Sequence, residues 1–109
     1  MKDSLNTCPV NVTLKVIGGK WKLPLLWYLR EGKHRYSELQ RLIGRITPKM
    51  LAQQLRELER DGIVARVVFP VVPPKVEYSM TAYGRSLLPI IKTMGDWGDK
   101  HLKRPLHAK

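Results

Sequence analysis

The chain has few cysteines, few acidic residues and no long apolar run. Cys8 is the single cysteine among 109 residues, so no disulfide can form within one chain, which is compatible with a reducing compartment. No stretch approaches the roughly 18 consecutive apolar residues of a membrane-spanning helix, and the first residues lack the apolar core of a signal peptide. We therefore expect a cytoplasmic protein with no membrane partner.

Catalytic and metal-binding patterns are also missing. His34, His101 and His107 have no second ligand at metal-binding spacing, and no cluster of Cys, Asp or Glu surrounds them. The sequence contains no Ser, His and Asp set, no P-loop and no dinucleotide fingerprint. We predict no metal, no cofactor and no enzymatic activity.

Basic residues are abundant: 20 Lys and Arg face 9 Asp and Glu, which gives a formal net charge of +11. A polyanionic partner is the simplest explanation, although bulk charge alone does not separate DNA from RNA or an anionic membrane. The length predicts one domain spanning residues 1–109.

The segment from Thr47 to Val64 is the most informative stretch. Thr47 can cap a helix, Pro48 suits its first turn and Gly62 suits its end. At about 100° per residue, one face carries the apolar residues Leu51, Leu55 and Leu58, and the opposite face carries Lys49, Gln53, Arg56 and Arg60. A solvated helix surface would show the same polar face, so the flanking elements decide the interpretation.

Those elements predict an α+β, mainly helical fold. We expect a helix at Pro9–Ile17 and another from near Lys20 to about Arg30. A short helix should follow, capped by Ser37 and ending at Ile43, with Leu39, Leu42 and Ile43 facing inward. A helix, a turn, a second helix and a strand pair form a winged helix-turn-helix, in which the second helix normally enters the DNA major groove.

The strand pair comprises residues 63–69 and 75–80, joined by the tip at 70–74. Val76, Tyr78 and Met80 alternate with Lys75, Glu77 and Ser79, which predicts one packed and one solvated face. The tip is apolar, so we place backbone phosphate contacts at Arg66 and Lys75 instead. Ordinary exposed strand residues are the alternative for both.

The last helix should run from Thr81 to about Leu102, with Pro89 kinking or splitting it. Its apolar face is wider than a small domain easily covers, which favours a homodimer contact by residues 81–103; packing across its own domain is the alternative. The expected interface consists of Leu87, Leu88, Ile90, Ile91, Met94 and Trp97. Residues 104–109 form a basic tail that we expect to be loose.

Five motifs in this order resemble the HxlR-type family of bacterial transcription regulators. They are Cys8-Pro9, IGGKWK at 17–22, RYSEL at 35–39, ITPKMLAQQLRELERDGIV at 46–64 and VPPKVEYSMTAYGRSLLP at 72–89. The resemblance covers nearly the whole chain. It implies a winged-helix homodimer that binds palindromic operator DNA, and several members of that family sense electrophiles or oxidants through a cysteine near the N-terminus.

The resemblance also suggests roles for single residues. Lys49 and Gln53 lie near the N-terminal end of the expected recognition helix and should contact bases. Phosphate contacts are expected from Arg35, Ser37, Arg56, Arg60, Arg66 and Lys75. Ser37 is alternatively only a helix cap.

Cys8 is the candidate sensor of a small electrophile or oxidant. It should precede the first helical residue, Pro9, and a helix N-terminus favours thiolate over thiol; Lys2 and Lys15 would add to this effect. The alternative is a small buried residue that anchors the first helix. A disulfide would have to join two subunits or a small thiol.

We therefore predict a dimeric, sequence-specific DNA-binding repressor that responds to oxidants or electrophiles through Cys8. One alternative is a basic architectural or RNA-binding protein without sequence preference. Another is a protein-interaction adaptor that uses the last helix. A sequence-specific protein keeps a preferred site in excess competitor DNA, whereas an electrostatic binder loses it as salt rises.

Overall fold

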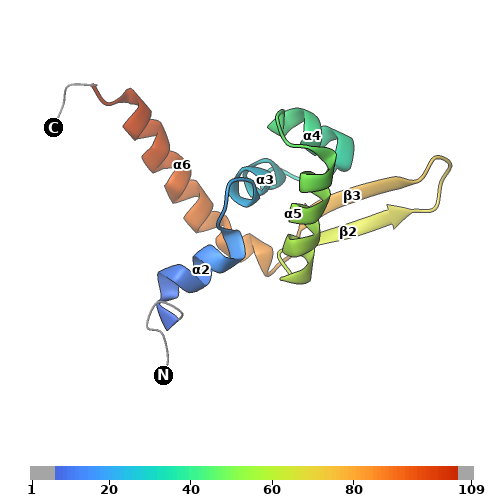
Figure 1. Cartoon of the computed structure of the whole chain (residues 1–109), viewed down its shortest axis with the longest axis horizontal. Coiled ribbons are helices and arrows are strands. Elements are labelled where there is room, and N and C mark those ends of the chain that lie inside the picture. The colour runs from blue at the N-terminus through green and yellow to red at the C-terminus, as the bar shows by residue number, and fades with distance from the viewer. Residues whose placement is uncertain (1–6, 106–109) are drawn as a thin grey trace.

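The computed structural model describes residues 7–105, and in it the middle helices of the chain pack on one side of a small antiparallel sheet (Figure 1). In chain order the elements are α2 (Pro9–Ile17), α3 (Lys22–Leu29), β1 (His34–Arg35), α4 (Tyr36–Ile43), α5 (Pro48–Arg60), β2 (Val64–Phe69), β3 (Lys75–Met80), the 3-10 helix η1 (Gly84–Leu87) and α6 (Leu88–Lys103). Their order and packing confirm the α+β winged helix-turn-helix expected from the sequence.

The first two helices match the expected order with a small shift in one boundary. α2 has the predicted bounds, whereas α3 begins at Lys22, two residues after the expected start at Lys20. Pro24 is the third residue of α3, where a backbone N–H would have no partner within the helix. Leu25, Leu26 and Leu29 are buried as predicted.

The start of α4 corrects the prediction for Ser37. The helix begins at Tyr36, so Arg35 is the N-cap residue and Ser37 lies inside the first turn. The Glu38 carboxylate accepts a hydrogen bond from the Arg35 backbone N–H at 2.7 Å, which satisfies the helix start without a serine cap. Leu39 is buried, but Leu42 is 41% exposed, so its predicted inward position was wrong.

The sheet contains one strand more than the predicted pair. β2 and β3 are antiparallel from Val64 opposite Met80 to Phe69 opposite Lys75, and β1 pairs with the other edge of β3. β3 is therefore the central strand. Its polar face is less solvated than expected, because the side chain of Glu77 is only 15% exposed between the ammonium groups of Lys33 and Lys75.

The last helix is split, as the position of Pro89 predicted, but it does not begin at Thr81. The Thr81 hydroxyl instead donates to the Gly62 carbonyl at 2.6 Å and accepts from the Gly84 N–H at 2.8 Å. These bonds connect the base of the strand pair to η1, and α6 then begins at Leu88 with Pro89 in its first turn.

The hydrophobic core lies where α3, α4 and α5 meet the sheet. Its buried apolar residues are Ile17, Leu25, Leu26, Leu29, Leu39, Ile46, Leu51, Leu55, Leu58, Ile63, Val64, Tyr78, Met80 and Ile91. In Figure 1 the β2–β3 ribbon projects from one side of this core, and α2 and α6 extend from the other. Within residues 7–105, no helix is both long and apolar enough to span a bilayer.

Candidate nucleic-acid interface

Helix α5 is fixed at both ends and along its back. The Thr47 hydroxyl accepts a hydrogen bond from the Met50 backbone N–H at 3.1 Å, and Gly62, with φ of 76°, ends the helical stretch. Leu51, Leu55 and Leu58 are at most 1% exposed. The helix therefore has the predicted bounds, and its apolar face is held by the core.

The opposite face of α5 is accessible. Lys49, Gln53, Arg56 and Arg60 are all exposed. Arg60 has a weak ion pair with its neighbour Asp61, at 3.9 Å. The face can therefore present three cations and one amide to a partner without any rearrangement of the backbone.

A partly buried ion pair lies behind this face. The Lys22 ammonium on α3 donates to the Glu57 carboxylate on α5 at 2.5 Å, and the Gln53 amide donates to the other oxygen of the same carboxylate at 3.2 Å. The hydrogen bond from Lys22, then that from Gln53, lowers the pKa of the Glu57 carboxyl. Both donors therefore favour the charged form of Glu57.

The start of α4 and the ribbon tip enclose a hollow of about 470 Å³. Arg35, Ser37 and Lys75, three of the expected phosphate contacts, all line it. The Lys75 ammonium is 3.3 Å from a Glu77 oxygen and 5.0 Å from the centre of the Phe69 ring. The fold thus brings together the N-terminus of α4 and two basic side chains, Arg35 and Lys75, that are far apart in sequence.

A second hollow, of about 320 Å³, lies between α5 and β2. It brings Arg56 together with Arg66, and Glu59 shares the lining. The six expected phosphate-contact residues thus include one group beside the ribbon tip and another beside the C-terminal half of α5, with Arg60 exposed one turn after Arg56.

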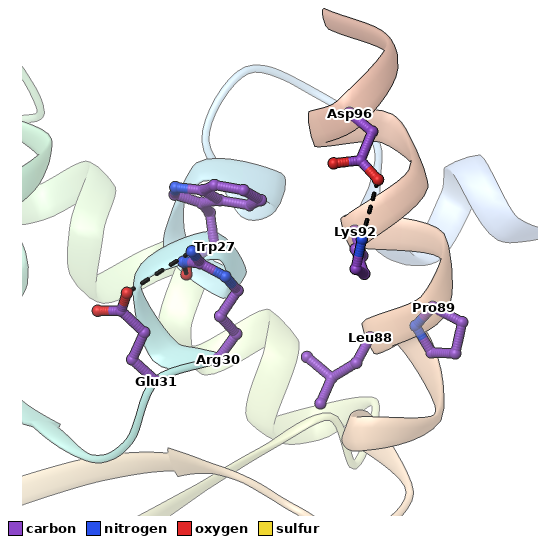
Figure 2. Close-up of a pocket in the computed structure, with 7 residues that line it drawn as sticks. All are labelled: Trp27, Arg30, Glu31, Leu88, Pro89, Lys92 and Asp96. Atoms are coloured by element: carbon purple, nitrogen blue, oxygen red, sulfur yellow. Dashed lines mark hydrogen bonds and ion pairs between the residues drawn. The ribbon is translucent and has the colours of Figure 1, made fainter. Parts of the chain in front are cut away.

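A third hollow, of about 720 Å³, is separate from these groups and lies between α3 and α6 (Figure 2). The Arg30 guanidinium stacks on the Trp27 ring with 3.6 Å to the ring centre, and it is 3.6 Å from the Glu31 carboxylate. Lys92 and Asp96 pair along α6 at 3.0 Å. The charged side chains at this hollow are therefore paired with one another.

Cys8 is the N-cap residue of α2 and Pro9 is its first residue, as predicted. The Cys8 carbonyl accepts the first helical hydrogen bond from the Val12 N–H at 2.9 Å, and the side chain is half-buried. Lys15 is in the last turn of α2, at the other end of the helix from Cys8. Lys2, like His107 and the tail residues 106–109, lies outside the described residues.

The expected dimer face divides into two parts. Ile91 is 3% exposed, and Leu87 and Leu88 are half-buried against the core, so Ile91 offers no surface to a second subunit and that part of the prediction is corrected. Ile90, Met94 and Trp97 are 42%, 49% and 67% exposed. These three residues remain as an uncovered apolar stripe along α6.

Sequence patterns missed three residues that support the interface. Lys22 and Glu57 form the ion pair behind α5, and the Tyr36 hydroxyl donates to the Pro48 carbonyl at 2.5 Å, which ties the start of α4 to the start of α5. A lysine within the apolar pattern of α3 was the only sequence signal for this pair. No sequence pattern indicates the role of Tyr36, because its hydrogen bond spans the turn between two helices.

Comparison with known proteins agrees with this geometry. A sequence model of the HxlR-like helix-turn-helix family matches residues 16–105. The HTH-type transcriptional regulator YdeP of Bacillus subtilis (strain 168) is 54% identical over 102 residues, which cover 94% of this chain and 80% of that protein. YtfH of Escherichia coli (strain K12), also an HTH-type transcriptional regulator, is 43% identical over 94% of this chain and 81% of its own length.

Solved structures show the same architecture. The redox regulator HypR in its oxidised form superposes with a TM-score of 0.83 at 55% identity, covering 85% of this chain and 96% of that one. The diamide-treated transcriptional regulator YodB from B. subtilis gives a TM-score of 0.71 at 35% identity, covering 85% and 93%. None of these relatives supports an architectural or RNA-binding role.

Proposed function

The chain belongs to the HxlR-like helix-turn-helix family of transcriptional regulators, and we propose that it is a dimeric repressor that binds a palindromic operator. The observation that carries this proposal is helix α5, which is capped at Thr47, buried along its leucine face and exposed at Lys49 and Gln53. An exposed polar face on a rigidly held second helix is the arrangement that helix-turn-helix proteins insert into the major groove.

The contacts divide by the chemistry of their targets. Lys49 and Gln53 contact base edges from the N-terminal half of α5. Phosphates are contacted by Arg35, Ser37 and Lys75 beside the ribbon tip and by Arg56, Arg60 and Arg66 beside the C-terminal half of α5. Phosphate contacts supply affinity and base contacts supply sequence preference.

Pairing of two subunits through Ile90, Met94 and Trp97 would cover the apolar stripe on α6. For both subunits to contact one operator, the twofold axis must place the two α5 helices about 34 to 36 Å apart, which is one turn of B-DNA. The dimer would therefore require a palindromic site.

The test is selection of bound duplexes from a random library, followed by affinity measurements on the selected operator and on random DNA at several salt concentrations. Lys49→Ala should reduce discrimination at one base pair of each half-site by about 1 to 3 kcal/mol. Arg60→Ala should weaken operator and random DNA alike and lower the salt slope by about 1. An equal loss on both DNAs for Lys49→Ala would refute its assignment to a base.

Cys8 supplies a proposed redox response. The half-buried thiol lies at the start of α2, and HypR, a redox regulator 55% identical to this chain, has been solved in oxidised and reduced forms. Oxidation by diamide would join Cys8 to a small thiol or to a second subunit. Diamide should release operator DNA from the wild-type protein and not from Cys8→Ser. The same response in both proteins would reject Cys8 as the sensor.

A further inference from the structure

Lys22 is the one charged residue that is buried within residues 7–105, at 8% exposure. Burying an ammonium group is costly unless it is paired, and Lys22 is paired with Glu57 across 35 residues of sequence. An apolar side chain at this position would pack against the core without that cost. The position of Lys22 therefore requires an explanation beyond packing.

The Glu57 carboxylate connects Lys22 to Gln53 on the exposed face of α5. One Glu57 oxygen accepts from Lys22, and the other accepts from the Gln53 amide at 3.2 Å. An ionised carboxylate only accepts hydrogen bonds, so the amide nitrogen of Gln53, and not its oxygen, must face Glu57. Lys22 holds one oxygen of this carboxylate, and so fixes the position at which the other oxygen accepts from Gln53. Both hydrogen bonds lower the pKa of Glu57, that from Lys22 the most.

This orientation leaves a defined set of groups on Gln53. One hydrogen of its amide nitrogen is used by Glu57, while the second hydrogen and the amide oxygen remain for a partner on the exposed side of α5. A donor beside an acceptor matches the major-groove edge of adenine, which presents an N7 acceptor and an N6 donor. No other base carries both a hydrogen-bond acceptor and a hydrogen-bond donor on its own major-groove edge.

We propose that Lys22 is a positioning residue which, through Glu57, orients the Gln53 amide to recognise adenine in each operator half-site. The proposal rests on the function proposed above and assigns the base that Gln53 recognises. Lys22 does not touch DNA in this arrangement. It also balances the Glu57 charge, which would otherwise repel nearby phosphates.

The experiment is library selection and affinity measurement with the whole 109-residue chain, comparing wild type with Gln53→Ala, Lys22→Met and the double variant. The wild type should select an A·T pair at one position of each half-site, and Gln53→Ala should lose about fivefold or more of the preference there. Lys22→Met should lose preference at the same pair. In the double variant, Lys22→Met should add nothing to the loss caused by Gln53→Ala.

A matched control is Lys92→Met, which removes an exposed ion pair on α6 and should leave the selected sequence unchanged. NMR titration of the Glu57 carboxyl provides a readout independent of DNA, because its pKa should rise in Lys22→Met and should not change in Lys92→Met. The dispersion of the amide resonances in the same spectra shows whether Lys22→Met is folded, because an unfolded chain would also lose the pKa shift.

The outcomes separate the two proposals. If the wild type selects no preferred sequence, the proposed function fails. If it selects one, and Lys22→Met keeps the preference that Gln53→Ala loses, the positioning role is overturned. A base pair other than A·T at the Gln53-dependent position overturns the assignment of adenine.

Discussion

Gly84 and Gly98 should respond in opposite ways to the same substitution. Gly84 is buried in η1, and a Cβ placed there would lie 2.9 Å from the carbonyl carbon of Ile63 and closer still to its oxygen. That carbonyl cannot easily retreat, because it accepts a hydrogen bond from the Thr81 N–H at 3.0 Å. Gly98 lies within α6, and a Cβ there meets nothing within 4 Å.

The expected magnitudes follow from these contacts. Forcing a methyl group into a packed backbone site costs about 3 kcal/mol, of which the lower chain entropy of alanine offsets about 0.5 to 1 kcal/mol. Gly84→Ala should therefore destabilise the protein by about 2 kcal/mol, which lowers Tm by about 8 °C in a domain of this size. Gly98→Ala should gain about 0.5 to 1 kcal/mol, because alanine is the better helix former.

Urea unfolding followed by circular dichroism measures both changes. All variants must be compared at one protein concentration, since formation of the proposed dimer would make the midpoint depend on it. The urea midpoint should fall for Gly84→Ala and rise for Gly98→Ala, with an unchanged m value. A Gly84→Ala protein as stable as wild type would refute the close contact with Ile63.

The remaining predictions concern the cap of α5, the acid response and the dimer face. Thr47→Ala should lower the free energy of unfolding by about 1 kcal/mol, because the Met50 N–H loses its acceptor. Thr47→Ser keeps a hydroxyl acceptor and should not; equal losses in both variants would contradict the capping role of Thr47. Folding lowers the pKa of Glu57 below its ordinary value of 4.5. The charged carboxylate therefore contributes its full stabilisation above about pH 4.5, and this contribution is lost as the pH falls through the pKa of the folded protein. Glu57→Gln should therefore lose less stability than wild type between about pH 5 and pH 3, and parallel urea midpoints would refute this. Trp97→Ala should weaken dimer association about 30-fold, as measured by sedimentation equilibrium. The control is Tyr83→Ala, because Tyr83 is 69% exposed but lies outside α6, and this variant should associate normally. Unchanged association of Trp97→Ala would exclude the proposed interface.

The bounds of α5 could be predicted because strong local signals mark both ends. Thr47, Pro48 and Gly62 each act through backbone chemistry that depends on neighbours in sequence, and the three buried leucines repeat at helical spacing. β1 could not be predicted in this way, since it is two residues long and forms only through pairing with β3. β1 covers the edge of β3 with Arg35 opposite Glu77, which helps to shield the Glu77 side chain from solvent.

The ion pair behind α5 required the three-dimensional structure. Lys22 and Glu57 are 35 residues apart, and neither residue alone indicates its partner. The exposed face of α5 was visible in the sequence, but the groups that orient it were not. The same limit applies to Ile91, because a helical pattern identifies an apolar face without showing whether the core or a second subunit covers it.

Short connections join the proposed dimer helix to the recognition helix. Gly62 follows the end of α5, and its carbonyl accepts from the Thr81 hydroxyl, which in turn accepts from the N–H of Gly84 at the start of η1. α6 follows η1 directly and is anchored in the core by Ile91. These contacts connect α6, through η1, to the base of the ribbon and to the C-terminal end of α5. In a dimer paired through α6, the angle between two such helices would set the spacing of the two α5 helices, so a change at the subunit contact would alter operator binding without any change in the residues that touch DNA.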